Sequence, residues 1–227
     1  MIRIISTLTI LFFSQLCYSQ SRPRTATTPS NNTSSSRSIG SNWKFGLGLG
    51  YSPVYLVNLS GSGSLTGAPY SVSYDFQYQY STSIQLDYWN LSRNNFGFIS
   101  GFQYEPQRTI YSGKLNGINV NVANVTFAKF QTNFLYIGAA YRWNIFYIPV
   151  GLTYGMHTVA PASNIGTTTT ENGFGYMLGL GWFVKDNFVI EYSARTAAIK
   201  MSYVNGTDFE NVSGTVAASV LSFKYFF

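Results

Sequence analysis

The sequence predicts an all-β fold, a transmembrane antiparallel up-and-down β-barrel of about eight strands. Three observations support it: polar and apolar side chains alternate along much of the chain, charged residues make up only 10% of it, and aromatic residues reach 18%. Water-soluble domains carry about 25% charged residues. A membrane barrel needs fewer, because its strands are apolar on the lipid-facing side and polar on the other.

The clearest alternation runs from Tyr70 to Tyr88, where the even positions are mostly aromatic or aliphatic and the odd positions are Ser, Gln or Asp. Successive side chains of a strand point to opposite faces, so this segment predicts one strand with an apolar side. Alternation elsewhere predicts seven more. The eight predicted strands are roughly 42–56, 70–88, 95–112, 118–143, 145–158, 172–184, 187–204 and 212–227.

The predicted connections alternate in length. Tight turns are expected near 90–94, 144 and 185–186, and longer polar loops at 57–69, 159–171 and 205–211. Short periplasmic turns and long external loops are typical of membrane barrels. All four tryptophans then fall at the periplasmic end, where we expect an aromatic girdle made of Trp43, Trp89, Trp143 and Trp182.

Residues 1–19 have the features of a cleaved signal peptide. Arg3 precedes an apolar stretch that ends at Leu16, and Cys17 and Ser19 are small residues ahead of a cut before Gln20. A lipid anchor on Cys17 is the alternative, but that kind of cut usually follows a small residue rather than a leucine.

Residues 20–41 predict a disordered linker, because Ser, Thr, Asn and Pro dominate and little can be buried. The predicted barrel occupies 42–227. The formal net charge of the whole chain is +6, but part of the basic excess lies in the signal peptide and the linker. The rest is not clustered on the barrel, so the charge does not predict a nucleic-acid partner.

The chain ends on an aromatic residue, with apolar or aromatic residues at the alternate positions before it. They are Leu221, Phe223, Tyr225 and Phe227. This ending resembles the assembly signal of bacterial outer-membrane barrels, and the chain from about residue 42 resembles the small OmpX/OmpA-like barrel-domain family. The resemblance implies the cell outer membrane of a Gram-negative bacterium, the barrel-assembly machinery, outer-membrane lipid and lipopolysaccharide as partners, and a monomer. It carries no catalytic residues.

Several charged side chains are expected to point into the lumen near the periplasmic end. They are Lys44, Asp87, Arg142, Glu191, Lys224 and, about one layer higher, Arg195. We expect them to pair and close the barrel, because an unpaired buried charge is costly. A charged constriction that selects solutes is the alternative. Inward glycines such as Gly181 are expected to make room for larger groups such as Tyr147.

His157 is the only histidine and the one residue to test for catalysis. Some eight-stranded barrels modify lipid A with a His and a Ser near the outer rim. Such a pair needs a hydroxyl within hydrogen-bond reach and a third group that orients the imidazole. The hydroxyls and the acid to consider are Ser163 and, if their strand end lies near, Ser71, Ser73 and Asp75. We expect instead a structural histidine, no catalytic residue, no cofactor and no metal site, since a lone histidine with scattered acids does not form one.

The third and fourth predicted strands are longer than the 9–11 residues that a tilted membrane strand needs. They predict a hairpin that turns near 112–117 and projects beyond the membrane. An exposed strand edge can pair with another chain. The resemblance to OmpX-like barrels, which often serve in surface attachment, implies a similar role. We therefore expect a non-enzymatic barrel that acts structurally or in surface binding and adhesion, through this hairpin and the external loops. A lipid A-modifying enzyme and a narrow channel are the alternatives.

Overall fold

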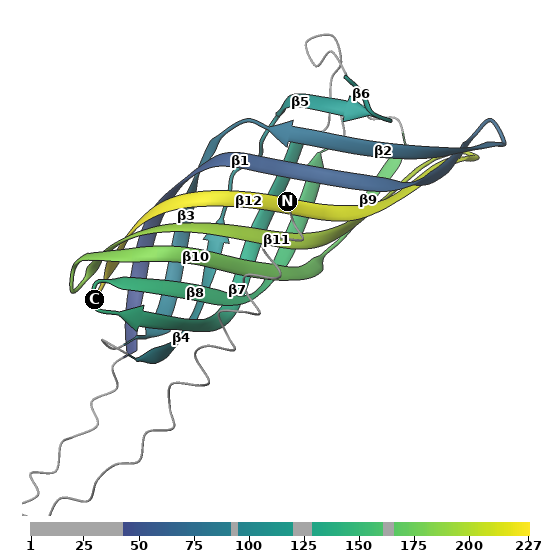
Figure 1. Cartoon of the computed structure of the whole chain (residues 1–227). Helices are drawn as coiled ribbons and strands as arrows, with labels where there is room; N and C mark the ends of the chain where they lie inside the picture. Colours follow the sequence, from purple (N-terminus) through teal and green to yellow (C-terminus); the bar gives the residue numbers. More distant parts are fainter. Residues whose placement is uncertain (1–42, 92–94, 120–128, 161–165) are drawn as a thin grey trace, which may run out of the picture. The chain divides into compact units, whose positions relative to one another are not determined.

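The computed structural model describes residues 43–91, 95–119, 129–160 and 166–227. They form one antiparallel sheet that closes on itself, because the last strand pairs with the first (Figure 1). Eight strands follow one another around the ring: β1 (Trp43–Leu65), β3 (Ser81–Asn90), β4 (Phe96–Tyr104), β7 (Lys129–Trp143), β8 (Phe146–Ala160), β10 (Gly173–Lys185), β11 (Phe188–Asn205) and β12 (Asp208–Phe226). The predicted eight-stranded up-and-down barrel is confirmed.

Four further strands extend the wall at the end of the barrel away from Trp43 and Phe226 (Figure 1). They are β2 (Ala68–Tyr78), β5 (Ile110–Leu115), β6 (Ile118–Asn119) and β9 (Thr167–Glu171). Together with the distal halves of β1, β11 and β12 they form a second region in the order β6, β5, β2, β1, β12, β11, β9. We call this region the projecting sheet, the end with Trp43 and Phe226 the terminal end, and the opposite end the distal end.

The loops predicted at 57–69 and 205–211 are wrong, because most of these residues are in strands. β1 continues to Leu65 and turns through Thr66 and Gly67, whose φ angles of 52° and 83° suit a two-residue hairpin turn. β11 and β12 meet at a similar turn that begins with Gly206. The Ser- and Gly-rich composition indicated a loop, but β2 and β12 pair with both edges of β1 here and hold it extended.

The single strand predicted at 70–88 is also wrong, because it divides into β2 and β3. Even positions such as Val72 and Phe76 are buried in β2, whereas odd positions such as Gln85 are buried in β3. The neighbouring β1 changes its buried face at the same level, next to Pro53, where its register with β12 shifts. A proline cannot donate to a ladder and commonly marks such an irregularity.

The long hairpin predicted from strands 95–112 and 118–143 does not form as expected. β4 ends at Tyr104, before Pro106, and β5 pairs with β2 instead of continuing the ladder with β7. Part of the loop predicted at 159–171 is the strand β9. The projection is therefore built mainly from the β1–β2 and β11–β12 hairpins. The predicted signal peptide at 1–19, the linker at 20–41, and residues 120–128 and 161–165 lie outside the described residues.

Exposed apolar side chains form a belt around the outside of the ring. It includes Phe45, Leu47, Leu49, Ile84, Leu86, Leu135, Ile137, Ile148, Leu152, Leu178, Leu180 and Phe223. Trp43, Trp143 and Trp182 border it at the terminal end, and Tyr51, Tyr80, Tyr104 and Tyr176 border it at the distal end. Such an apolar band between two aromatic girdles is the lipid-contacting surface of a membrane barrel. No helix in the described ranges has the length and hydropathy to cross a membrane.

A carboxylate clamp ties the two hairpins of the projecting sheet together. The hydroxyls of Tyr70 and Tyr74 on β2 donate to the carboxylate of Glu210 on β12, at 2.7 and 2.9 Å. Gly63 of β1 lies between them in the ladder, opposite both Tyr70 and Glu210. The hydrogen bond to Glu210 raises the pKa of Tyr70 to about 12, so this hydroxyl stays protonated and donates at neutral pH.

We expect Gly63→Val to open the tip of the projecting sheet and leave the ring intact. A Cβ at this position would lie 2.7 Å from the Tyr70 hydroxyl and 2.5 Å from the Phe209 carbonyl, so the clamp must separate. Limited proteolysis of the folded protein should cut near Thr66 and Gly67 roughly severalfold faster, because local opening governs such cleavage. Ser62→Val, on the exposed face of the same strand, is the control. Equal cleavage of both variants would contradict the clamp.

Candidate functional site

The terminal end of the barrel interior is filled by buried aromatic and aliphatic side chains, which we call the terminal plug. They are Trp89, Leu91, Ile99, Tyr136, Ala140, Tyr147, Met177, Phe183, Val189 and Phe226. Trp89 stacks on Phe226 with ring centroids 3.5 Å apart and on Phe183 at 5.5 Å. Gly181 faces Tyr147 at a distance that leaves no room for a Cβ, as the sequence predicted.

Three of the four tryptophans predicted for the periplasmic girdle are exposed on the outer surface at the terminal end: Trp43, Trp143 and Trp182. The prediction for Trp89 is wrong, because this side chain is 3% exposed and lies inside the barrel. The sequence placed it just after a strand, but β3 runs to Asn90 and directs its odd positions inward.

Four of the six charged residues predicted in the lumen form one buried network above the terminal plug. Lys224 lies at its centre, with Nζ 3.2 Å from Asp87 Oδ1 and 3.0 Å from Glu191 Oε1. Arg195 approaches Glu191 Oε1 at 3.7 Å. All four side chains are at most 6% exposed. We call them the charge network.

Two tyrosines of the terminal plug complete the charge network. Tyr136 donates its hydroxyl to Asp87 at 2.5 Å, and Tyr147 donates to Glu191. The guanidinium of Arg195 lies 4.2 Å from the centre of the Tyr136 ring. Both carboxylates therefore accept hydrogen bonds and face cations, and these contacts fix their positions in the network.

Lys44 and Arg142 do not join the charge network, contrary to the prediction. Each stands at or next to the end of its strand, so its long side chain reaches a turn instead. Lys44 Nζ donates to Asn187 Oδ1 at 2.7 Å. Arg142 Nε donates to the Asn144 carbonyl at 3.0 Å, and its guanidinium lies 3.6 Å from the centre of the Phe183 ring. Both cations thus lie beside the terminal plug.

A second buried ion pair, between Glu105 and Arg108, was missed from the sequence. Arg108 donates to Glu105 Oε2 at 2.6 Å and to the Gln79 carbonyl at 3.2 Å, and Gln103 also donates to Glu105. Glu105 and Arg108 lie in the segment between β4 and β5, where the strict alternation ends. Pro106 in the middle of a predicted strand was the available signal, since proline is rare inside central strands.

The distal end of the interior is closed by a second apolar cluster, the distal plug. Its buried members are Tyr55, Val57, Leu59, Val72, Phe76, Tyr78, Phe130, Phe134, Ala197, Ile199, Val212, Val216 and Ala218. Arg108 connects it to the second ion pair, because its guanidinium lies 4.4 Å from the centre of the Tyr55 ring. The interior therefore consists of buried charges between two apolar plugs.

His157 faces the interior and both of its ring nitrogens are occupied. Nδ1 lies 2.9 Å from Thr132 Oγ1, and Nε2 lies 2.9 Å from the Ala198 carbonyl. The carbonyl can only accept, so Nε2 carries the proton and Nδ1 accepts from Thr132. His157 is 6% exposed. Ser71, Ser73 and Asp75 are on the outer face of β2, away from the interior, and Ser163 lies outside the described residues.

Two solved outer-membrane proteins share this fold. The crystal structure of OprG from Pseudomonas aeruginosa matches with a TM-score of 0.58 and 13% identity, over 81% of this chain and 95% of that one. The solid-state NMR structure of AlkL in DMPC bilayers matches with a TM-score of 0.55 and 10% identity, over 90% of this chain and 97% of that one. The chain folds as a small outer-membrane β-barrel. Its sequence matches no protein-family model and no curated protein.

This fold orients the barrel in the membrane. A closed barrel with an apolar belt spans the outer membrane, with the start of its first strand and the end of its last strand on the periplasmic side and its longer extensions outside the cell. The terminal plug then lies at the periplasmic end, and the projecting sheet rises from the cell surface. Phe223, Tyr225 and Phe227 are exposed on the lipid-facing side, and Leu221 is half-buried. Their role as an assembly signal stays a prediction.

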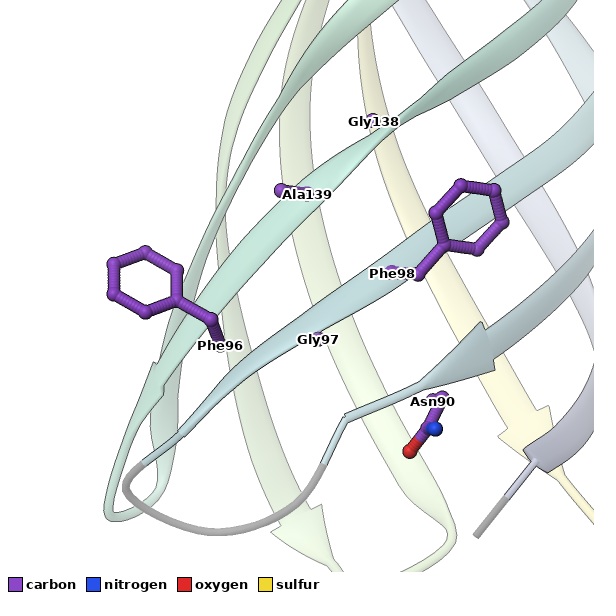
Figure 2. A pocket seen from close by; sticks show the side chains of 6 residues that line it. All are labelled: Asn90, Phe96, Gly97, Phe98, Gly138 and Ala139. Atoms are coloured by element: carbon purple, nitrogen blue, oxygen red, sulfur yellow. The ribbon is translucent and has the colours of Figure 1, made fainter. Parts of the chain in front are cut away.

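The outer wall of the barrel has a hollow of about 330 Å³ between β4 and β7 (Figure 2). It is lined by Asn90, Phe96, Gly97, Phe98, Gly138 and Ala139. Phe96 and Phe98 project outward from β4, and Ala139 on β7, opposite Phe98 in the ladder, is small enough to leave the space. These side chains include no acid, base or nucleophile, so the hollow offers lipid contact rather than catalysis. In the described ranges, no group of three or more His, Cys, Asp or Glu residues could hold a metal ion.

Proposed function

We propose that this protein is a closed, non-enzymatic outer-membrane barrel that acts at the cell surface through its projecting sheet. The observation that carries the proposal is the division of the molecule into two parts. The interior is filled by the terminal plug, the charge network and the distal plug. The projecting sheet, in contrast, presents an extended surface outside the membrane.

The packing of the interior supports a closed barrel over a channel. A solute would have to displace fully buried side chains, including Phe226 and Tyr147 in the terminal plug and Phe134 in the distal plug. Between the plugs, it would meet cations and anions that already neutralise one another. An eight-stranded barrel is just wide enough for side chains to fill it.

The surroundings of His157 support a structural role over catalysis on lipid. Its imidazole joins β7, β8 and β11 through Thr132 and the Ala198 carbonyl. Thr132 does place a hydroxyl beside the imidazole, but Thr132 is 0% and His157 6% exposed, so a substrate could not reach this pair. Outer-leaflet lipid would also lie on the far side of the barrel wall from this buried ring.

One experiment with matched cells distinguishes the proposed surface role from the alternative of a lipid A-modifying enzyme. Cells would carry no protein, the wild type, His157→Ala, or a variant in which residues 60–73 are replaced by Asn-Gly. The replacement closes the β1–β2 hairpin at Leu59 and Tyr74, which already face each other in the ladder. Adherence to surfaces and to other cells is measured together with the mass spectrum of lipid A.

We expect the shortened variant to lose adherence while it still folds, as judged by heat-modifiable gel migration. Lipid A should be identical in all four strains, and His157→Ala should adhere like the wild type. A changed acyl pattern that disappears in His157→Ala would make the protein an enzyme. Full adherence of cells with the shortened variant would remove the projecting sheet from the function.

A further inference from the structure

The outer face of the projecting sheet carries a regular array of short polar side chains. Three rows cross β2, β1 and β12, as the ladders of these strands show. The rows are Asp75, Asn58 and Thr215; Ser73, Ser60 and Ser213; and Ser71, Ser62 and Asn211. All nine residues are exposed except Ser73, which is half-buried. We call them the hydroxyl grid; Figure 1 shows the three strands side by side.

The hydroxyl grid is held in place by strand pairing and by the packing behind it. Neighbouring strands are about 4.7–4.9 Å apart, and alternate residues of one strand are about 6.6 Å apart. The opposite face of the same strands supports it, because Val57, Leu59, Val72 and Val212 are buried in the distal plug. The grid is therefore a preformed surface, which lowers the entropy cost of binding.

The side chains of the hydroxyl grid are unusual for a surface that only faces water. Water-facing surfaces carry roughly 25–35% charged residues, most of them long, whereas Asp75 is the one charged residue in the grid. Each hydroxyl or amide can both donate and accept hydrogen bonds. Among the described residues, no hydrogen bond joins these nine side chains to one another. Their polar atoms are thus available to a partner.

The charged and apolar side chains at the borders of the grid indicate which class of molecule the partner belongs to. Two lysines border the grid, and each lies beside a carboxylate. Lys200, beside Ser213 on β11, is paired with Glu171 at 3.2 Å, and Lys114 on β5 lies opposite Asp75 in the ladder, so the border has no excess of positive charge for an anionic polymer. Phe209 lies in the row beyond Asn211, opposite Ser64, and is 43% exposed. An exposed ring beside hydroxyl and amide groups suits a sugar, which has polar edges and an apolar C–H face.

The position of the grid above the membrane favours one source of such sugars. Asn58 is seven residues beyond Tyr51 of the distal aromatic girdle. At about 3.3 Å per residue and a strand tilt of roughly 40°, the grid begins about 18 Å outside the apolar belt. It faces sideways, toward whatever stands beside the barrel at that height. In an outer membrane this neighbour is the sugar portion of lipopolysaccharide.

We propose that the hydroxyl grid binds the neutral sugar chain of lipopolysaccharide. This inference rests on the proposed function of the projecting sheet and names its ligand. The nine short side chains supply hydrogen bonds along the chain, and Phe209 supplies a contact for one sugar ring. Because each contact is weak, binding depends on an unobstructed surface, and a long side chain at the centre of the grid should block it.

The test uses the full protein folded in phosphatidylcholine vesicles and a fluorescent polysaccharide that mild acid has released from lipopolysaccharide. Ser60→Lys places a long charged side chain at the centre of the grid. Ser60→Thr keeps a short hydroxyl. Thr158→Lys adds the same lysine to an exposed position of β8, outside the grid. Chondroitin sulfate serves as the anionic comparison, and heat-modifiable migration verifies folding.

We expect saturable binding of the released polysaccharide to the wild type, to Ser60→Thr and to Thr158→Lys. Ser60→Lys should weaken it at least tenfold, and chondroitin sulfate should bind more weakly than the neutral chain. Absence of saturable binding, or equal binding to Ser60→Lys, would overturn the inference. The adherence experiment separates this inference from the proposed function. If the polysaccharide does not bind but cells with the shortened hairpin still lose adherence, the proposed function stands and the ligand of the projecting sheet is a protein rather than this polysaccharide.

Discussion

Replacing Lys224 with methionine should destabilise the barrel by about 3–5 kcal/mol, the usual cost of removing one partner from a buried ion pair. Lys224 is the only cation within 3.2 Å of both Asp87 and Glu191 in the described part of the chain. Its removal leaves two buried carboxylates facing each other, with only the more distant Arg195 as compensation. Methionine nearly preserves the volume of the side chain, so the loss reports on charge rather than on packing.

The matched control is Lys200→Met, which removes a lysine from the exposed pair with Glu171. Both of those side chains are about 70% exposed, at 69% and 70%. An exposed pair contributes about 0–1 kcal/mol, so this variant should unfold almost like the wild type. Urea unfolding in detergent micelles, followed by heat-modifiable migration, measures both. Similar midpoints for the two variants would show that the charge network does not hold the barrel together.

The residues of the charge network could be predicted from the sequence where polar and apolar residues alternate without interruption along the strand. Asp87, Glu191 and Lys224 lie inside β3, β11 and β12, and parity alone places them in the lumen. Lys44 and Arg142 have the same parity but stand at strand ends, where a long side chain can reach a turn. Parity gives the direction of a Cβ, not the place that a flexible side chain reaches.

The projecting sheet was not predictable by the same reasoning, because its strands are held by their neighbours. The segment from Asn58 to Ser64 has the composition of a loop, and only the pairing of β1 with both β2 and β12 makes it a strand. The change of buried face near Pro53 likewise involves two strands at once. The sequence of one strand does not contain that information. For this reason the hydroxyl grid became visible only in the structure.

Trp89→Ala should both destabilise the barrel and weaken its seal at the periplasmic end. Trp89 contacts three rings, with centroid distances of 3.5 Å to Phe226, 5.4 Å to Tyr147 and 5.5 Å to Phe183. Truncation of a buried tryptophan costs about 3–5 kcal/mol, because the cavity that it leaves collapses only in part. Here the cavity lies between the charge network and the periplasm, so water and ions can enter it.

Planar-bilayer recordings should therefore show no conductance steps for the wild type and brief, small steps for Trp89→Ala. Trp143→Ala is the control, because Trp143 lies at the same end but is 69% exposed on the outer surface. Its loss should leave the interior closed and cost less stability. Conductance in the wild type would favour a channel over a closed barrel. Equal behaviour of the two variants would mean that the seal depends on the charge network and not on the stacked rings, since that network is what both variants keep.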